Sequence, residues 1–219
     1  MFLNSNNAEQ RNGGSNIAAA TAMYPYNAEI SAGSLLPLES KRIAALLLTM
    51  PDEAAWRHAV EVENILQKKT PATARRQATL LRRRITTLDA EAWTMISQSQ
   101  HEVAIQMLLA ASVKHSHLLG DFLLKVYAHR QRRLESALAP VDWHDFLTEC
   151  AHHDPAVAGW SESTRAKLFQ VIVRILVEAK YLQNARSMKL TPRSLHPAVR
   201  RYLAARHETY VLDCLERAA

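Results

Sequence analysis

Arginine side chains gather along one flank of a helix that the sequence predicts over residues 71–87. With Ala74 at zero and an advance of about 100° per residue, Ala78, Leu81 and Ile85 fall within about 40° and form the buried stripe. The flank beside this stripe carries Arg75, Arg76, Thr79, Arg82 and Arg83. Lys68 and Lys69 come just before the helix. A guanidinium group donates paired hydrogen bonds to phosphate oxygens, so this pattern indicates recognition of a polyanion.

A basic helix face is also compatible with simple solvation, since arginine is a good helix former. A second cluster weighs against that interpretation, because no acidic residue occurs between Glu178 and Glu208. The cluster consists of Lys180, Arg186, Lys189, Arg193, Arg200, Arg201 and Arg206. Aromatic residues make up only 6% of the chain. Single-strand binders add aromatic stacking platforms, so duplex is favoured over single-stranded nucleic acid.

Other candidate sites are weaker. Cys150, His152 and His153 lie close together, but a zinc ion needs three or four ligands and no matching half exists in the sequence. Asp142, Asp145 and Glu149 are more simply explained as acids near a helix N-terminus. The sequence also lacks the GxxxxGK[ST], GxSxG and HExxH motifs. We therefore expect no catalytic centre, no metal, no cofactor and no small-molecule substrate.

Composition bounds the class of protein. The 219 residues are 48% hydrophobic and 22% charged, as in an ordinary globular protein. The net charge of +6 favours polyanionic partners. The longest apolar run, about six residues from Ile43 to Leu48, is far short of the roughly 20 needed to cross a bilayer. Two distant cysteines and no signal peptide favour the cytoplasm.

The elements that must position these residues are helices, since glycine is rare and apolar residues recur at helical spacing after Ser34. We expect a nearly all-α helical bundle in four segments. They are a disordered tail (1–26), a helix-turn-helix-like unit (27–88), a helical scaffold (89–140) and a winged-helix-like unit with a last helix (141–219). In the second segment, one helix runs from near Leu36 to Leu48, another starts at Pro51, and the basic helix begins at Pro71 with Thr70 as its N-cap.

The winged-helix-like unit is predicted from an amphipathic helix that Ser161 or Ser163 caps, followed by one short β-hairpin. The hairpin would pair Tyr181–Leu182 with 188–190 around a polar turn. We expect a second contact surface from Ser163, Thr164, Arg165, Lys167, Arg186, Lys189 and Arg193. The chain would close with one unbroken helix from Pro197 to Leu215.

Several ordered segments carry a family resemblance that spans about residues 27–205. They are SAGSLLPLESKRIAALLL (31–48), ENILQKKTPATARRQATLLRRRI (63–85), WSESTRAKLFQVIVRILVEAKYL (160–182) and LTPRSLHPAVRRYL (190–203). Together they resemble the BrxA family of BREX bacteriophage-exclusion systems. Lys180 departs from the expected pattern, in which glycine precedes the hairpin. Lysine at this position makes a tight turn with a positive φ less favourable.

The resemblance implies a small non-enzymatic DNA-binding component of a multi-gene defence system, which distinguishes self DNA by methylation and blocks phage replication. It also implies a fold similar to helical nucleic-acid binders of the transcription antitermination type. Double-stranded DNA and other BREX proteins are the expected partners, and no binding to a membrane is expected. Two alternatives stay open: a protein-interaction adaptor within the BREX complex, and an RNA-binding protein. The second rests on fold analogy alone.

Overall fold

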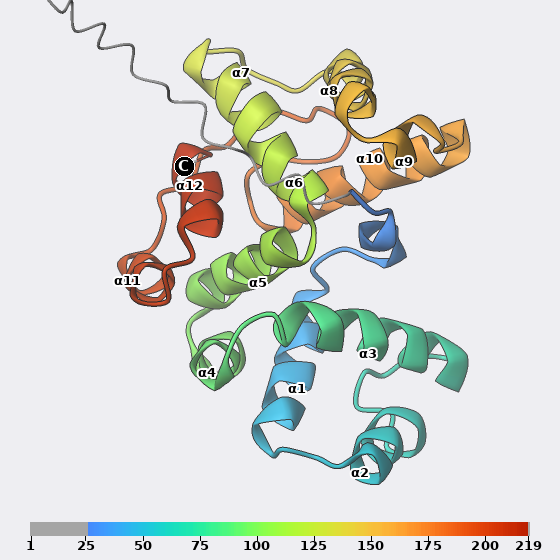
Figure 1. The fold of residues 1–219 in the computed structure, drawn as a ribbon. Coiled ribbons are helices and arrows are strands. Elements are labelled where there is room, and N and C mark those ends of the chain that lie inside the picture. Colours follow the sequence, from blue (N-terminus) through green and yellow to red (C-terminus); the bar gives the residue numbers. More distant parts are fainter. Residues whose placement is uncertain (1–25, 219) are drawn as a thin grey trace, which may run out of the picture.

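The structure, a computed structural model, describes residues 26–218, and its nearly all-α architecture confirms the predicted fold class (Figure 1). The first half contains η1 (Glu29–Ala32), α1 (Pro37–Leu48), α2 (Glu53–Arg57), η2 (His58–Val62), α3 (Pro71–Ile85), α4 (Ala90–Gln98) and α5 (His101–His115). The second half contains α6 (His117–Phe122), η3 (Leu123–Tyr127), α7 (Ala128–Arg132), α8 (Pro140–His153), α9 (Pro155–Ala158), α10 (Glu162–Glu178), α11 (Pro197–Ala205) and α12 (Thr209–Arg217). The tail predicted over 1–26 lies outside the described residues, except for Tyr26.

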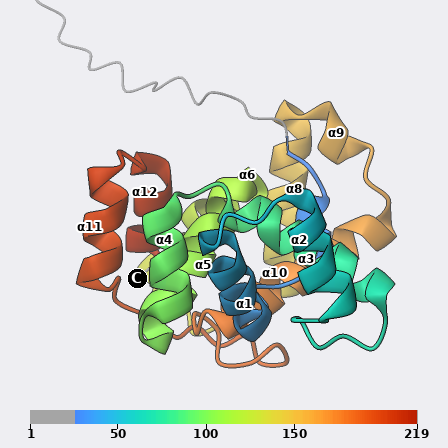
Figure 2. The same ribbon diagram turned by 90° about the horizontal axis from the view of Figure 1, so that it is seen from below.

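Helix α5 forms the centre of the molecule. Every residue from Val103 to Val113 is buried, which is typical of a helix surrounded by other elements. It packs against several other helices: α1, α3, α4, α6, α11 and α12. In Figure 2, α11 and α12 lie on one flank of this core and α8 and α9 on the opposite flank.

The helices around α3 begin largely where the sequence places them. Asp52 caps α2 by accepting a hydrogen bond from the Ala55 backbone N–H at 2.7 Å, so this helix begins two residues after the predicted Pro51. Thr70 caps α3 in the same way as predicted. The π-helical turn η2 continues directly from α2, and α3 packs against η2 and α1.

The segment that joins η1 to α1 is held from two sides. Arg84 of α3 is buried and donates to the carbonyl oxygens of Ser34 at 2.6 Å and Gly33 at 2.8 Å. Glu178 of α10 accepts hydrogen bonds from the Ser34 hydroxyl and the Leu35 backbone N–H. Burial lowers the pKa of Arg84 to about 10, although the charge of Glu178 opposes this shift. The two charged groups thereby connect the N-terminal helices to α10.

Ser161, rather than Ser163, caps α10, and the predicted hairpin after this helix differs from regular strands. Leu182 and Leu190 form an isolated antiparallel bridge, and the Thr191 backbone N–H donates to the Tyr181 carbonyl at 2.9 Å. The chain thus reverses at the predicted turn, but within residues 26–218 no extended strand pair forms there.

The prediction that Lys180 disfavours a positive φ is wrong, because its φ is 66°. Tyr181 and Leu182 both donate backbone hydrogen bonds to the Leu176 carbonyl and are themselves buried. A left-handed residue at a helix C-terminus costs about 1 kcal/mol when it is not glycine. Burial of Tyr181 and Leu182 offsets this cost, while the Lys180 side chain stays exposed.

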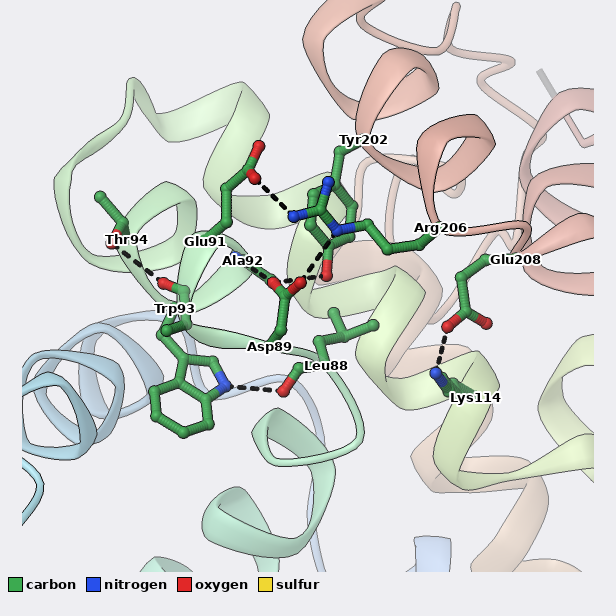
Figure 3. A network of polar contacts seen from close by, with 11 residues as sticks. Leu88, Asp89, Glu91, Ala92, Trp93, Thr94, Lys114, Tyr202, Arg206 and Glu208 are labelled. Atoms are coloured by element: carbon green, nitrogen blue, oxygen red, sulfur yellow. Dashed lines mark hydrogen bonds and ion pairs between the residues drawn. The ribbon is translucent and has the colours of Figure 1, made fainter.

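The expectation of one unbroken last helix is also wrong. Helices α11 and α12 are separate, and His207 between them has a φ of 55°. Polar contacts hold this corner against α4 and α5 (Figure 3). Arg206 pairs with Asp89 at 2.9 Å and with Glu91 at 2.5 Å, and Glu208 pairs with Lys114. The corner therefore follows from contacts between distant segments.

Candidate nucleic-acid interface

Helix α3 brings the predicted arginine flank to the surface. Its buried residues are Ala74, Ala78, Leu80, Leu81, Arg84 and Ile85, which include the whole predicted stripe. The side chains of Arg75 and Arg83 are 64% and 62% exposed. Arg82 is less exposed, at 39%. We call the residues Lys69, Arg75, Arg76, Thr79, Arg82 and Arg83 the α3 surface.

Arg75 and Arg82 are paired with carboxylates from the preceding helical segment, which the sequence did not predict. Arg75 donates from Nε and Nη2 to the two carboxylate oxygens of Glu61, at 2.9 and 3.0 Å. Arg82 donates from Nη1 to Glu53 at 3.3 Å. Its guanidinium carbon also lies 4.4 Å from the centre of the Trp56 ring. Two guanidinium groups are thus oriented by contacts with α2 and η2.

Arg83 is paired with a third carboxylate, from η1. Its Nη1 lies 3.5 Å from one oxygen of Glu29, whose other oxygen lies 3.4 Å from Nε2 of His115. Burial is the first cause of a lowered pKa at His115, and the charge of Arg84 adds to it. The imidazole is therefore held toward its neutral form. Glu29 is left with Arg83 as its cationic partner.

A groove lies between α3 and the α2–η2 segment, with a volume of about 600 Å³. Its charged lining residues are Glu53, Arg57, Glu61, Arg75, Arg82 and Arg83. The lining thus contains four arginines and two glutamates, and its net charge is positive. Trp56 and Val60 supply apolar parts of the wall.

The remaining predicted residues at this end of α3 differ in availability. Within residues 26–218, no carboxylate lies within ion-pair distance of Lys69 or Arg76, and both are exposed. Lys68 instead pairs with Glu39 at 2.5 Å and is 19% exposed. The Thr79 hydroxyl donates to the Arg75 carbonyl oxygen at 2.9 Å. Lys69 and Arg76 are thus the two cations here that need no rearrangement to meet an anion.

At the start of α10, two predicted contact residues serve the fold. Arg165 donates from Nε to the Trp160 carbonyl oxygen at 3.1 Å, and its side chain is 23% exposed. The Thr164 backbone N–H donates a hydrogen bond to the hydroxyl oxygen of Ser161, the N-cap of α10. Ser163 lies on the surface next to the Ser161 hydroxyl, at 3.0 Å. Lys167 is exposed and lies 3.5 Å from Gln170.

Beyond Lys180, the loop after α10 carries three exposed cations, Arg186, Lys189 and Arg193, which we call the loop surface. Within the described part of the chain, none of them forms an ion pair. Asn184 shapes the turn, because its side-chain oxygen accepts hydrogen bonds from the backbone N–H groups of Arg186 and Ser187. The loop surface is therefore a fixed turn with uncompensated positive charge.

Pairing of distant segments adds basic residues that were not predicted from the sequence. Ala137 forms a bridge with Lys189, and the Leu190 backbone N–H donates to the Ser136 carbonyl at 2.9 Å. This pairing places the end of α7, with exposed Arg132 and Arg133, beside the loop surface. Arg133 pairs with Glu135 at 2.8 Å. No signal in the sequence links 132–137 to 186–190.

No group of three or more His, Cys, Asp or Glu side chains in residues 26–218 is arranged to hold a metal ion. None of the helices in the same range is long and apolar enough to cross a membrane.

The fold and these surfaces define a small helical protein with a buried central helix and exposed arginine-rich faces. The family model described as BrxA matches residues 24–207, so the chain belongs to the BrxA family. This agrees with the resemblance in the sequence segments.

Similar proteins cover nearly the same length. A protein named BREX protein BrxA from Paramagnetospirillum magneticum is 41% identical over 191 residues, which are 87% of this chain and 96% of that protein. Another of the same name from Escherichia coli O9:H4 is 34% identical over 188 residues, covering 86% and 88% of the two chains. The crystal structure of an uncharacterized protein from Magnetospirillum magneticum aligns with a TM-score of 0.82 at 39% identity. That alignment covers 89% of this chain and 100% of the other.

Proposed function

We propose that this protein is a non-enzymatic component of a BREX phage defence system that binds double-stranded DNA through the α3 surface and the loop surface. The observation that carries the proposal is the group of exposed cations with no carboxylate partner in the described residues. On the α3 surface and the loop surface these cations are Lys69, Arg76, Arg186, Lys189 and Arg193. Unpaired surface cations release counterions when they meet a phosphate backbone, which supplies affinity without base contacts.

The paired arginines of the α3 surface support the same function in a second way. Ion pairs exposed to solvent contribute only about 0–1 kcal/mol, so phosphates can replace the carboxylates at Arg75, Arg82 and Arg83. Lys68 and Arg165 are tied to Glu39 and to backbone carbonyls, and we assign them to the fold instead. Ser163, Thr164 and Lys167, at the start of α10, stay proposed contacts.

Binding of fluorescent duplex DNA, single-stranded DNA and structured RNA by the full-length protein tests this proposal. We expect the duplex to bind most tightly, and an excess of unlabelled duplex to displace each probe. Arg76→Gln and Arg186→Gln should each weaken duplex binding. Arg217→Gln is a matched control, because Arg217 pairs with Asp213 on α12, a helix that belongs to neither surface. Preference for RNA, or equal losses in all three variants, would refute the proposal.

A protein-interaction adaptor is the second candidate. The observation that favours it is the exposure of Leu134 (91%) and Val141 (54%), which flank the corner between α7 and α8. Co-purification of the other BREX proteins separates the two functions. Under the adaptor hypothesis, complexes survive nuclease treatment and survive neutralisation of Arg75, Arg76, Arg82 and Arg83. Under the DNA-binding proposal, phage resistance is lost in that variant.

A further inference from the structure

The contact between Arg75 and Glu61 has the geometry of an oxyanion site that is already filled. Arg75 holds both oxygens of one carboxylate through Nε and Nη2, at 2.9 and 3.0 Å. The same two donors of a guanidinium group bind two oxygens of a phosphate in the same fork arrangement. Glu61 is 24% exposed, so the carboxylate is held in the groove, while Arg75 itself is 64% exposed.

Arg82 and Glu53 form a second pair further along α3, through a single hydrogen bond. Arg82 lies seven residues, or about two helical turns, from Arg75, on the same flank. Its guanidinium group is oriented by the Trp56 ring at 4.4 Å and lies 3.3 Å from Glu53. Both glutamates come from α2 and η2, the opposite wall of the same groove. One wall thus presents carboxylates to the arginines of the other.

We propose that Glu61 and Glu53 occupy phosphate positions on the α3 surface, so that a DNA backbone must displace them to bind Arg75 and Arg82. This inference rests on the proposed function and adds a self-screening step to it. The glutamates lower affinity for any polyanion, because each pair must open before the arginine gains a phosphate. A nucleic acid that engages only Lys69 and Arg76 leaves both pairs closed and gains no contact with Arg75 or Arg82.

A charge-conserving variant tests the displacement without altering the net charge. In Glu61→Asp the side chain is one methylene shorter, so the carboxylate cannot hold both nitrogens of Arg75 in the same position. Glu63→Asp is the matched control, because Glu63 lies two residues away in the same segment and contacts His58 instead, at 3.1 Å. Thermal unfolding of both variants, with transitions close to that of the wild type, verifies that the fold is intact.

Titration of a short mixed-sequence duplex by fluorescence anisotropy gives the outcome. We expect Glu61→Asp to tighten Kd by about 1.5- to 5-fold, the range for release of one exposed ion pair, and Glu63→Asp to leave Kd unchanged. Glu61→Gln should gain more affinity for the duplex than Glu63→Gln. If wild type binds duplex and Glu61→Asp gives no gain, or the two Gln variants gain equally, the displacement is refuted while DNA binding stands. If neither the wild type nor any variant binds duplex, both the proposed function and this inference are refuted.

Discussion

Arg84 donates a hydrogen bond from Nη1 to the Ser34 carbonyl oxygen at 2.6 Å, from the helix whose opposite flank carries the exposed arginines. One helix therefore uses arginine for two purposes. Arg84 fixes the start of α1 in the interior, while Arg76 on the outer flank has no carboxylate partner within residues 26–218. The orientation of the α3 surface relative to the rest of the molecule depends on this buried contact.

Replacement of Arg84 by Met should destabilise the protein by about 2–4 kcal/mol. The substitution leaves the carbonyl groups of Ser34 and Gly33 without their donors and leaves Glu178 without a nearby buried cation. Urea unfolding measures the difference. Arg83→Met, on the adjacent exposed position, is the control and should change the free energy of unfolding by less than about 1 kcal/mol. Equal effects in the two variants would contradict the role given to Arg84.

Gly120 should not tolerate even alanine. A Cβ atom at this position would collide with the Tyr210 hydroxyl, which donates to Asp121 at 2.7 Å. We expect Gly120→Ala to cost about 1–3 kcal/mol, because α12 must shift. Differential scanning calorimetry should show a lower Tm, and Tyr210→Phe in the same chain should recover part of it, since the colliding oxygen is gone.

Gly159 provides the control for this effect. A Cβ atom there would meet its nearest neighbour, the Ala156 carbonyl oxygen, at 3.5 Å, which is ordinary contact. Its φ of −76° suits any residue. Gly159→Ala should therefore leave Tm unchanged or raise it slightly. If Gly159→Ala lowers Tm as much as Gly120→Ala does, the collision with Tyr210 is not the cause of the lower Tm.

Asp89 should make stability depend on acidic pH. Burial alone would raise the pKa of this carboxyl, but hydrogen bonds from Arg206, the Ala92 backbone and Tyr202 outweigh it, and the pKa is lowered. Since the pKa is lower in the folded than in the unfolded chain, the carboxylate stabilises the fold above the unfolded value of about 3.9. This contribution is lost as pH falls through the folded value.

Urea unfolding of wild type and Asp89→Asn across this pH range measures the contribution. Asparagine still caps α4 but removes one of the two carboxylate partners of Arg206, so that only Glu91 remains. We expect the wild type to be more stable near neutral pH, by less than about 1 kcal/mol because the pair is half exposed. The difference should shrink at low pH. A difference that grows as pH falls would contradict the account.

The two thiols should be unreactive in the folded protein. Cys150 and Cys214 are buried, and burial raises their pKa to about 11 and about 12. Only the thiolate reacts with iodoacetamide, so labelling at neutral pH should follow unfolding. Mass spectrometry of native and urea-treated samples measures the label. Rapid modification of the native protein would show that one of these side chains is accessible.

Local signals predicted the helices and their caps well. Thr70 before Pro71 marks the start of α3, and the spacing of Ala74, Ala78, Leu81 and Ile85 identifies its buried face, because both depend on neighbours within a few residues. The helix ends that were predicted wrongly depend on residues far away in the sequence. The break at His207 accompanies the pairing of Glu208 with Lys114, and the left-handed turn at Lys180 follows from burial of Tyr181.

In the candidate surfaces too, features set by nearby residues could be predicted and features set by distant residues could not. Helical periodicity identified the flank that carries Arg75 and Arg82, and both are on the surface. The pairing of these groups with Glu61 and Glu53 could not be predicted, since the carboxylates lie 14 and 29 residues away on another element. Periodicity also says nothing of Arg84, which faces inward and is the longest polar side chain in the core.

The salt dependence of duplex binding tests the central claim most directly. We expect the Kd of the wild type to rise steeply between about 50 and 200 mM salt. A plot of log Kd against the logarithm of the salt concentration should have a slope of about 0.9 for each phosphate neutralised. A variant with Lys69, Arg76, Arg186 and Lys189 changed to Gln should bind more weakly and with a shallower slope. A flat response of the wild type, or the same slope in the variant, would contradict DNA binding through these two surfaces.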